Sequence, residues 1–422
     1  MNSSKLRPFT LASSLALSLS IAAVAAGCGS SSSSAAPSSG DAGVDGASAG
    51  GEGGSTAPVA GLKPNEWVWA PVAGAYCRDG SDTGFAVSLA SPPSDKLMIY
   101  FEAGGACMDQ FFCSAIATPV TFGASEFTSW KAHSGSAPSM PDTGLFNRGD
   151  AANPVAGWNM VYIPYCTGDI FSGANPNGMV PNVGPQKFVG YTDVHLDLER
   201  IVPTFPGTTK VLLSGSSAGA YGAVANYVQT TRAFGGSTSV YLLGDSGPPL
   251  EAPYVANCAQ TQLAGLWGKD GALADCGSDC SNPNSYFTDF TKHLTKTYPT
   301  MPFGLVSSTQ DQIMGLFFGY GNPGNCVDSA LPTSTLPGAT YQAGLQDAEM
   351  KLAGAPNWGA FLYAGTQHTS VETTATLDAN STNVTASLLE PDGGAPPDAG
   401  TIKLTDWIAT LVNEGKVSNV GP

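Results

Sequence analysis

The stretch LLSGSSAGAYG, residues 212–222, decides the fold because it contains G-x-S-x-G, the frame of a nucleophile elbow. Only Ser217 has that frame, between Gly215 and Gly219; the other two serines of the stretch do not. In such an elbow the serine lies on a strained strand-to-helix turn, where side chains two positions away would collide with nearby backbone. Ser217 is therefore the candidate nucleophile.

The flanking residues predict the strand and the helix that this motif requires. TKVLLS, residues 209–214, is a short apolar run typical of a buried strand, and AGAYGAVANYVQ, residues 218–229, favours a closely packed helix. The alternative is a Gly/Ser-rich turn that matches by chance in a chain with 52 glycines. We predict an α/β-hydrolase fold, a mostly parallel sheet with helices on both faces. Near the C-terminus, TIKLTDWIATLVNEG predicts a last helix packed on the domain through Leu404, Trp407, Ile408, Leu411 and Val412.

The first sixty residues have the composition of export and tether segments. Residues 1–28 have the basic start and apolar run of a signal peptide, and VAAGC resembles a lipobox ending at Cys28. Residues 29–60 are rich in Ser, Gly and Ala and too poor in apolar residues to fold, which predicts a disordered linker. We expect residues 61–422 to form the catalytic domain of an exported bacterial envelope protein. It is lipid-anchored through Cys28, or secreted if that cysteine is not lipidated.

Eight cysteines follow the lipobox, an even number that indicates up to four disulfides in an exported chain. Close spacing favours Cys107 with Cys113 and Cys276 with Cys280. The pairing of the remaining four stays open: Cys77, Cys166, Cys258 and Cys326. A zinc site at Cys276 and Cys280 lacks a second nearby pair of ligands, so we expect neither a metal nor a cofactor.

The net charge of −16 limits the partners that the protein can bind. An acidic chain without basic runs is a poor ligand for nucleic acid and for anionic lipid surfaces. It contacts a membrane only through the predicted lipid anchor, and a strongly anionic polymer is an unfavourable substrate. We expect a monomer that acts on an acylated carbohydrate or another ester.

A serine nucleophile needs a histidine base, and in α/β-hydrolases the chain order is Ser, then Asp or Glu, then His. Only two of the four histidines follow Ser217. His293 lies in YFTDFTKHLTKTY, an amphipathic helical pattern, whereas His368 follows WGAFLYAGTQH, a buried strand that breaks into a loop. A base is best displayed at the carboxyl end of a strand near the elbow, so His368 is the candidate.

The acid must then lie between Ser217 and His368. MPFGLVSSTQDQIM repeats the layout seen at the histidine, which favours Asp311 just past a strand end. Asp245, in VYLLGDSGPP, is the rival because it too ends a strand. The letters GDSG also fit a type of esterase that would use Ser246, but that type places the motif near the start of its domain. It also carries a D-x-x-H block, which this chain lacks.

The oxyanion donors are predicted in the loop after an upstream strand. LMIYFEAGGACMD runs from a strand at 97–101 into Gly104 and Gly105, whose backbone N–H groups no side chain obstructs. Together with the N–H of Ala218, which follows the nucleophile, they are candidates for an oxyanion hole.

Four segments, taken in order, resemble the pectin acetylesterase (Notum-like) family: CRDGSDTGFAV (77–87), YFEAGGAC (100–107), WNMVYIPYCTGDIFSG (158–173) and LLSGSSAGAYG (212–222). The resemblance spans residues 64 to 372. It implies an α/β-hydrolase fold and metal-free ester hydrolysis by Ser, Asp and His at the cell surface or outside it. It supports Ser217, Gly104, Gly105 and Ala218, and it matches Asp311 and His368 by order and context.

The chain departs from the family where the acyl or leaving group would lie. Family members have a run of glycines and a tryptophan before the cysteine, where this chain has Ala103 and Ala106. We expect a serine carboxylic-ester hydrolase that removes O-acetyl groups from a polysaccharide through an acyl-enzyme. The alternatives are a lipase-like or polyester-cleaving carboxylesterase, and a non-catalytic carbohydrate-binding surface lipoprotein.

Overall fold

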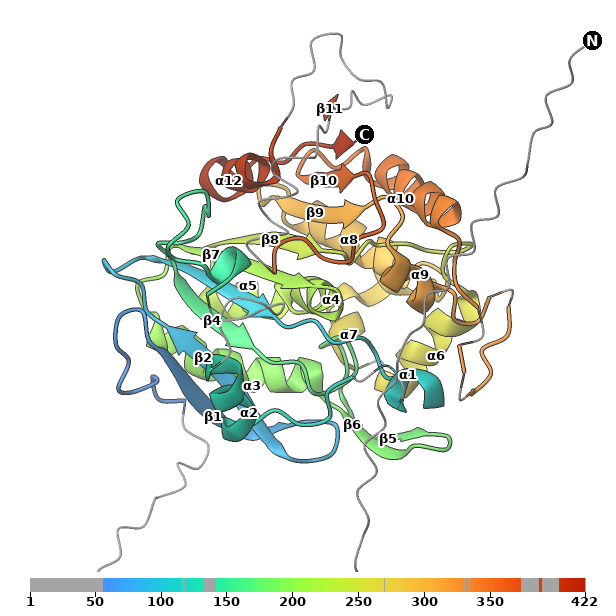
Figure 1. The fold of residues 1–422 in the computed structure, drawn as a ribbon, viewed down its shortest axis with the longest axis horizontal. Coiled ribbons are helices and arrows are strands. Elements are labelled where there is room, and N and C mark those ends of the chain that lie inside the picture. The colour runs from blue at the N-terminus through green and yellow to red at the C-terminus, as the bar shows by residue number, and fades with distance from the viewer. Residues whose placement is uncertain are drawn as a thin grey trace, which may run out of the picture. The chain divides into compact units, whose positions relative to one another are not determined.

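The computed structural model describes residues 56–422, except 115, 117, 133–141, 269, 323, 330, 333, 373–386, 389–401 and 422. The predicted signal peptide, Cys28 and the predicted linker up to residue 55 lie outside the described residues. A ten-stranded sheet, in the order β1-β2-β4-β3-β7-β8-β9-β10-β12-β11, occupies the centre of the domain (Figure 1). Its strands are β1 Trp67–Tyr76, β2 Asp82–Ser88, β3 Lys96–Phe101, β4 Asn159–Ile163, β7 Lys210–Ser216, β8 Ser239–Asp245, β9 Phe303–Ser308, β10 Trp358–Tyr363, β11 Ser387–Leu388 and β12 Val420–Gly421.

The middle of the sheet is parallel, from β4 through β3, β7, β8, β9 and β10 to β12. Antiparallel pairs add β2 and β1 at one edge and β11 at the other. A separate hairpin consists of β5 Asn175–Val180 and β6 Gly184–Phe188. Because parallel strands run in the same direction, the loops after β3, β7, β9 and β10 all emerge at the carboxyl ends of the strands, at the same end of the sheet.

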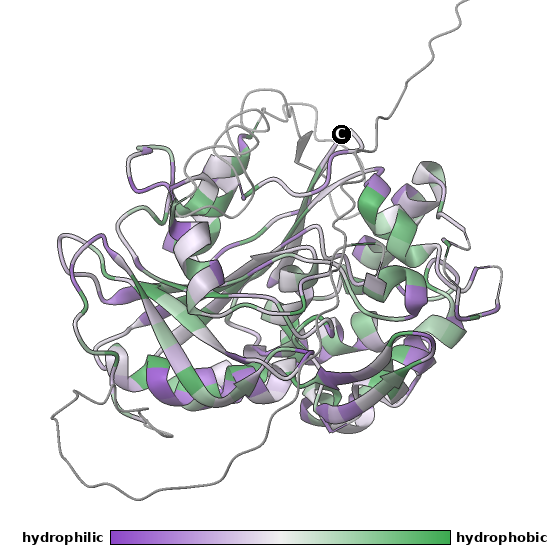
Figure 2. Ribbon diagram, turned by 60° about the horizontal axis from the view of Figure 1, so that its bottom comes forward, coloured by the Kyte–Doolittle hydropathy of each residue, from purple (hydrophilic) through white to green (hydrophobic). Residues whose placement is uncertain are grey.

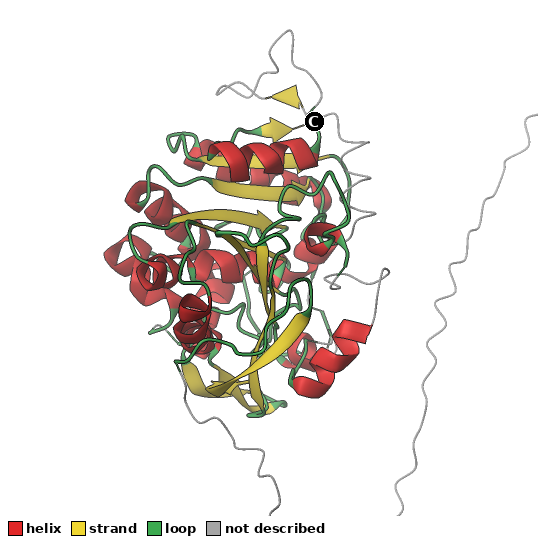
Figure 3. Cartoon of the chain, turned by 90° about the vertical axis from the view of Figure 1, so that its left-hand side faces the viewer, coloured by secondary structure: helices red, strands yellow, loops and turns green. Residues whose placement is uncertain are grey.

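Helices cover both faces of the sheet, as the view along it shows (Figure 3). They are α1 Gln110–Ser114, α2 Ala124–Ala132, α3 Gly190–Thr204, α4 Ala218–Ala225, α5 Tyr227–Phe234, α6 Asn257–Trp267, α7 Ala272–Cys276, α8 Tyr286–Thr297, α9 Gln312–Phe318, α10 Gly338–Leu352 and α12 Leu404–Glu414. The α/β-hydrolase fold predicted from the elbow is confirmed.

Alternate side chains of each central strand enter two different hydrophobic cores. In β3, Leu97, Ile99 and Phe101 belong to the larger core, whereas Met98 and Tyr100 belong to the smaller one. This alternation follows from the two-residue period of a strand, and it explains why the run is apolar throughout. Figure 2 shows the hydrophobic colour on the central strands and the hydrophilic colour mainly on loops and helix surfaces.

The last helix packs as the sequence indicates, whereas the packed part of the chain begins before the predicted end of the linker at residue 60. All five residues predicted for the apolar face of the last helix are buried in α12: Leu404, Trp407, Ile408, Leu411 and Val412. Val59, within the predicted linker, is also buried, and its N–H donates to Thr204 Oγ1 at 2.9 Å. The chain is therefore already packed on α3 at residue 59.

Four disulfides link segments of the domain. The predicted pairs Cys107–Cys113 and Cys276–Cys280 are confirmed. The pairs that the sequence left open are Cys77–Cys166 and Cys258–Cys326. Within the described ranges, no helix has the length and apolar character needed to cross a bilayer.

Candidate active site

Ser217 lies on the sharp turn between β7 and α4 with a backbone conformation that most side chains avoid. Its φ of 55° and ψ of −118° are strained for a residue with a Cβ, at a cost of about 1–3 kcal/mol. The turn is held because the N–H of Ser217 donates to the Asp245 carbonyl oxygen at 2.7 Å. Strain of this kind at a strand-to-helix turn displays the hydroxyl beyond the end of the sheet, although Ser217 itself is only 4% exposed.

The two glycines of the motif are required by close backbone contacts. A Cβ on Gly219 would lie 2.0 Å from the Phe101 carbonyl oxygen, and one on Gly215 would lie 2.3 Å from the Gly219 oxygen. The elbow therefore presses directly against the end of β3. This contact also places the loop that begins at Glu102 beside the nucleophile turn.

The other two serines of the stretch face the interior. Ser216 is fully buried, bonded to the Tyr100 hydroxyl at 2.8 Å, and donates to Asp245 Oδ2 at 3.2 Å. Ser214 is also fully buried within β7. Ser217, by contrast, lines a cavity, so it is the serine placed to meet a ligand.

Asp311 and His368 meet at the ends of two adjacent parallel strands. Asp311 follows β9 and His368 follows β10, and Asp311 Oδ2 lies 2.9 Å from His368 Nδ1. Asp311 is also the N-cap of α9, because its Oδ1 accepts the N–H groups of Ile313 and Met314 at 3.0 and 2.9 Å. One carboxylate therefore caps a helix and orients the imidazole, which leaves Nε2 as the free ring nitrogen.

Asp245, the rival acid, holds the backbone of the histidine loop instead of the imidazole. Its fully buried Oδ2 accepts the N–H groups of Ser370 and Val371 at 2.6 and 2.9 Å. Ser246, the alternative nucleophile, is buried too, and its Oγ accepts the Thr369 N–H at 3.0 Å. The strand end of β8 thus joins the elbow to the loop that carries the histidine.

The charge of Asp311 favours the protonated form of the His368 imidazole. Burial lowers the pKa of His368, but the hydrogen bond and charge of Asp311 outweigh it, so the pKa lies above its ordinary value. Burial raises the pKa of Asp245 to about 6, although the N–H groups of the histidine loop oppose that shift. Burial likewise raises the pKa of Glu102, just before the glycine pair, to about 7.

Two of the three predicted oxyanion residues line the same cavity as Ser217. They are Gly105, with a φ of 78° that suits glycine, and Ala218, the first residue of α4. Gly104 is packed against Tyr165, whose ring would lie 2.5 Å from an added Cβ. Gly105 and Ala218 therefore lie beside Ser217 at the cavity, whereas Gly104 is not among the lining residues.

A buried arginine that the sequence reasoning did not single out binds backbone carbonyls downstream of the predicted oxyanion residues. The Arg78 guanidinium donates to the carbonyl oxygens of Cys113, Thr118 and Pro119 at 2.9, 2.9 and 3.2 Å. The signal was present, because Arg78 belongs to the CRDG segment that carries the family resemblance. An arginine has five donors and can hold several carbonyls at once, so it fixes the loop without a carboxylate partner.

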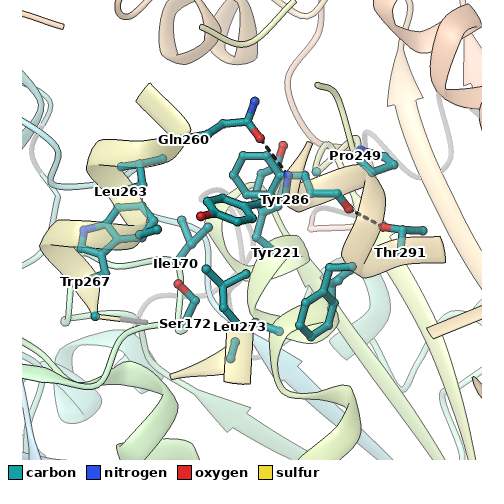
Figure 4. A pocket seen from close by; sticks show the side chains of 18 residues that line it. Ile170, Ser172, Tyr221, Pro249, Gln260, Leu263, Trp267, Leu273, Tyr286 and Thr291 are labelled. Atoms are coloured by element: carbon teal, nitrogen blue, oxygen red, sulfur yellow. Dashed lines mark hydrogen bonds between the residues drawn. The ribbon is translucent and has the colours of Figure 1, made fainter. Parts of the chain in front are cut away.

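The cavity at Ser217 is lined mainly by apolar side chains. They come from the segment before α1 and from α6, α8 and α9: Met108, Leu263, Trp267, Phe287, Met314, Phe317 and Phe318. A second apolar cavity shares Tyr221, Leu263, Trp267 and Phe287 with it, and extends between α6 and α8 (Figure 4). Polar groups are few there; Gln260 accepts the Tyr286 N–H at 3.0 Å, one of the dashed contacts in Figure 4.

Other titratable groups stand apart from this site. His293 lies on α8, as predicted, and pairs with Asp279 at 3.0 Å. Within the described part of the chain, no group of three or more His, Cys, Asp or Glu side chains could hold a metal ion.

The strand order, the elbow and the Asp–His pair define an α/β-hydrolase. Comparison with known proteins specifies the family: residues 67–388 match the pectinacetylesterase family, and the chain belongs to it. Zebrafish (Danio rerio) palmitoleoyl-protein carboxylesterase notum1a is 28% identical over 156 residues, covering 36% of this chain and 28% of that protein. Pectin acetylesterase 4 of Arabidopsis thaliana is 30% identical over 149 residues, covering 35% of this chain and 34% of that protein.

A solved structure shares the fold over a longer stretch. The Wnt deacylase Notum from Drosophila aligns with a TM-score of 0.50 and 21% identity, covering 72% of this chain and 86% of that one. The alignments to the curated relatives, by contrast, span only about a third of their length.

Proposed function

We propose that the protein is a serine carboxylic-ester hydrolase in which Ser217, His368 and Asp311 act as the catalytic triad. The observation that carries the proposal is the 2.9 Å contact between Asp311 and His368 on the edge where the strained Ser217 turn emerges. Asp245 supports it, because the same residue bonds the Ser217 N–H and the backbone after His368.

In the proposed reaction, His368 Nε2 takes the Ser217 proton while Oγ attacks the ester carbonyl carbon. Asp311 holds Nδ1–H and stabilises the imidazolium that forms. Backbone N–H groups of Gly104, Gly105 and Ala218 are the proposed donors to the oxyanion, each worth about 3 kcal/mol in comparable sites. The alcohol leaves with the proton, and water then hydrolyses the acyl-enzyme by the same steps in reverse.

Ser217 Oγ forms no hydrogen bond to the imidazole among the described residues. A serine–histidine contact that tightens only when substrate binds is common in ligand-free enzymes. The proposal therefore depends on both groups reaching one ester.

For the substrate, we propose an O-acetylated polysaccharide, which the family match over residues 67–388 favours. A second candidate is an ester with a longer acyl chain, as in a lipase-like or polyester-cleaving enzyme. The apolar lining at Ser217 favours this second candidate, because an acetyl group would contact only a few of its side chains. We also propose that the protein is exported and held at the bacterial cell envelope through Cys28.

The test compares purified wild type with Ser217→Ala and Ser216→Ala on p-nitrophenyl esters of increasing acyl length. We expect Ser217→Ala to lose activity by at least about 10⁴-fold, because the nucleophile is absent. Ser216→Ala removes a buried hydroxyl of the same stretch and keeps most of the activity if it folds. A rate maximum at acetyl supports the polysaccharide substrate, and a maximum at six or more carbons supports the second candidate. Equal rates for wild type and Ser217→Ala would refute the proposed nucleophile.

A further inference from the structure

A small buried cavity lies beside the N-terminal half of α3. Its lining differs in composition from that of the apolar cavity at Ser217. It is enclosed by β2, by the segment that follows β4, and by α3. Its polar lining comes from four side chains: Thr83, Thr167, Asp193 and Asp197. None of the four lines the cavity at Ser217.

The two aspartates of this cavity are buried with unpartnered oxygens. Asp193 is 6% exposed and Asp197 is 2% exposed. Asp193 Oδ1 accepts the Tyr76 N–H at 3.1 Å, but Asp193 Oδ2 and Asp197 Oδ1 have no hydrogen-bond partner among the described residues. Because they are four residues apart on α3, the two carboxyl groups lie on the same side of the helix.

The threonines of the lining offer lone pairs and no free proton. Thr83 Oγ1 donates its hydrogen to the Phe122 carbonyl at 2.7 Å, and Thr167 Oγ1 donates to Asp169 Oδ1 at 2.6 Å. The two threonine oxygens are thus acceptors toward any further partner, and each aspartate is an acceptor in its ionised form. Buried carboxylates whose oxygens lack donors, as Asp193 Oδ2 and Asp197 Oδ1 do among the described residues, are strongly unfavourable unless a proton or a cation compensates them.

The surrounding cations, Arg200 near Asp197 and Lys187 near Asp193, compensate the two carboxyl groups only in part. Burial raises the pKa of Asp197 to about 8, with only a counteracting effect from Arg200. Burial also raises the pKa of Asp193, and the charge of Asp197 adds to that shift. Arg200 itself donates to the backbone oxygens of Pro71 and Ala57.

We propose that this cavity binds one hard cation, Ca²⁺, between Asp193 and Asp197. Two carboxylates match a divalent charge, and the polar side chains of the lining carry only oxygen atoms, the donor type that Ca²⁺ prefers over zinc or copper. The remaining ligands would be neutral oxygens of the threonines and of the backbone after β4. The ion would tie α3 to β2 and to the segment 164–171, and this role is independent of the proposed esterase reaction.

The test is thermal unfolding of the whole mature protein after dialysis against EDTA, with and without CaCl₂, together with metal analysis. At a Ca²⁺ concentration a hundred times its Kd, we expect Tm to rise by at least about 3 °C. Asp197→Asn and Asp193→Asn should each abolish the rise. Asp406→Asn, a surface carboxylate in the first turn of α12, is the matched control and should keep it.

Other results would overturn the proposal. If wild type holds no calcium and its Tm is the same in CaCl₂ and EDTA, the carboxyl groups are instead protonated or bound to water. A Tm rise that persists in both variants would locate the ion elsewhere. Should either variant fail to fold, equilibrium dialysis of wild type against Ca²⁺ still decides, because binding of about one ion per chain is required.

Discussion

Asp311→Asn separates the two roles of Asp311, because its two oxygens have different partners. Oδ1 accepts two N–H groups of α9, and Oδ2 faces His368 Nδ1. Asparagine keeps one oxygen for the helix cap, and Asn and Asp cap helices about equally well, so the free energy of unfolding should change little. The NH₂ group that replaces Oδ2 cannot accept Nδ1–H, so the imidazole is held in the wrong tautomer.

We therefore expect Asp311→Asn to lower kcat by about 10³–10⁴-fold, the scale of this change in serine hydrolases with the same constellation. Asp311→Ala should match that loss and, in addition, destabilise the protein by about 1 kcal/mol, because the cap is lost. The assays are hydrolysis of a chromogenic ester and urea unfolding. Asp279→Asn is the matched control, since it breaks the surface Asp–His pair with His293 and should leave kcat unchanged.

The pH profile gives an independent check. His368 must be neutral to act as a base, and Asp311 raises its pKa while burial lowers it. Without the Asp311 charge, burial dominates and the pKa falls. The acidic limb of kcat/KM for the residual activity should then move to lower pH. If Asp311→Asn retains more than a tenth of wild-type kcat with an unshifted limb, Asp311 is not the acid.

Two further predictions concern the elbow and the histidine loop. Gly219→Ala places a Cβ 2.0 Å from the Phe101 oxygen, about 1.4 Å short of ordinary contact, so it should destabilise the protein by about 3 kcal/mol or more and abolish activity. Gly236→Ala, where nothing lies within 4 Å, is the control. Equal urea midpoints for the two variants would contradict the close approach. Asp245→Ala leaves two N–H groups of the loop after His368 unpaired, so it should lower kcat at least about tenfold and destabilise the protein by about 2–4 kcal/mol. Asp245→Asn keeps an acceptor, so its losses of kcat and of stability should be much smaller.

The sequence predicts the elements of this fold well, because their signals are local. The glycines around Ser217 report backbone contacts that any elbow makes, and the apolar runs before Asp311 and His368 report strands buried on both faces. The sequence also predicts the two disulfides between cysteines that are close in the chain, Cys107–Cys113 and Cys276–Cys280. It does not predict Cys77–Cys166 and Cys258–Cys326, because long-range pairing depends on how distant loops converge.

The sequence favours Asp311 over Asp245 only through a layout shared with the histidine segment, because the contacts that distinguish the two aspartates are not local. Each follows a buried strand, and each approaches the segment after His368, one through backbone N–H groups and the other through the imidazole. The difference depends on where residues 364–371 turn, and no short-range pattern specifies that path. Arg78 was missed for a similar reason, since its carbonyl partners lie 35 to 41 residues away.

Asp245 holds the turn of Ser217 and the loop of His368 at fixed positions relative to each other. Its carbonyl oxygen fixes the Ser217 N–H and its carboxyl group fixes the residues after His368, so both groups are referenced to the last residue of one central strand. Asp311 adds the second constraint by joining the imidazole to the start of α9. A loop held at both its backbone and its ring pays its ordering entropy during folding, which leaves less to lose when an ester binds. The two aspartates therefore have separate roles at the two strand ends: Asp245 binds backbone N–H groups of the loop, and Asp311 contacts the imidazole.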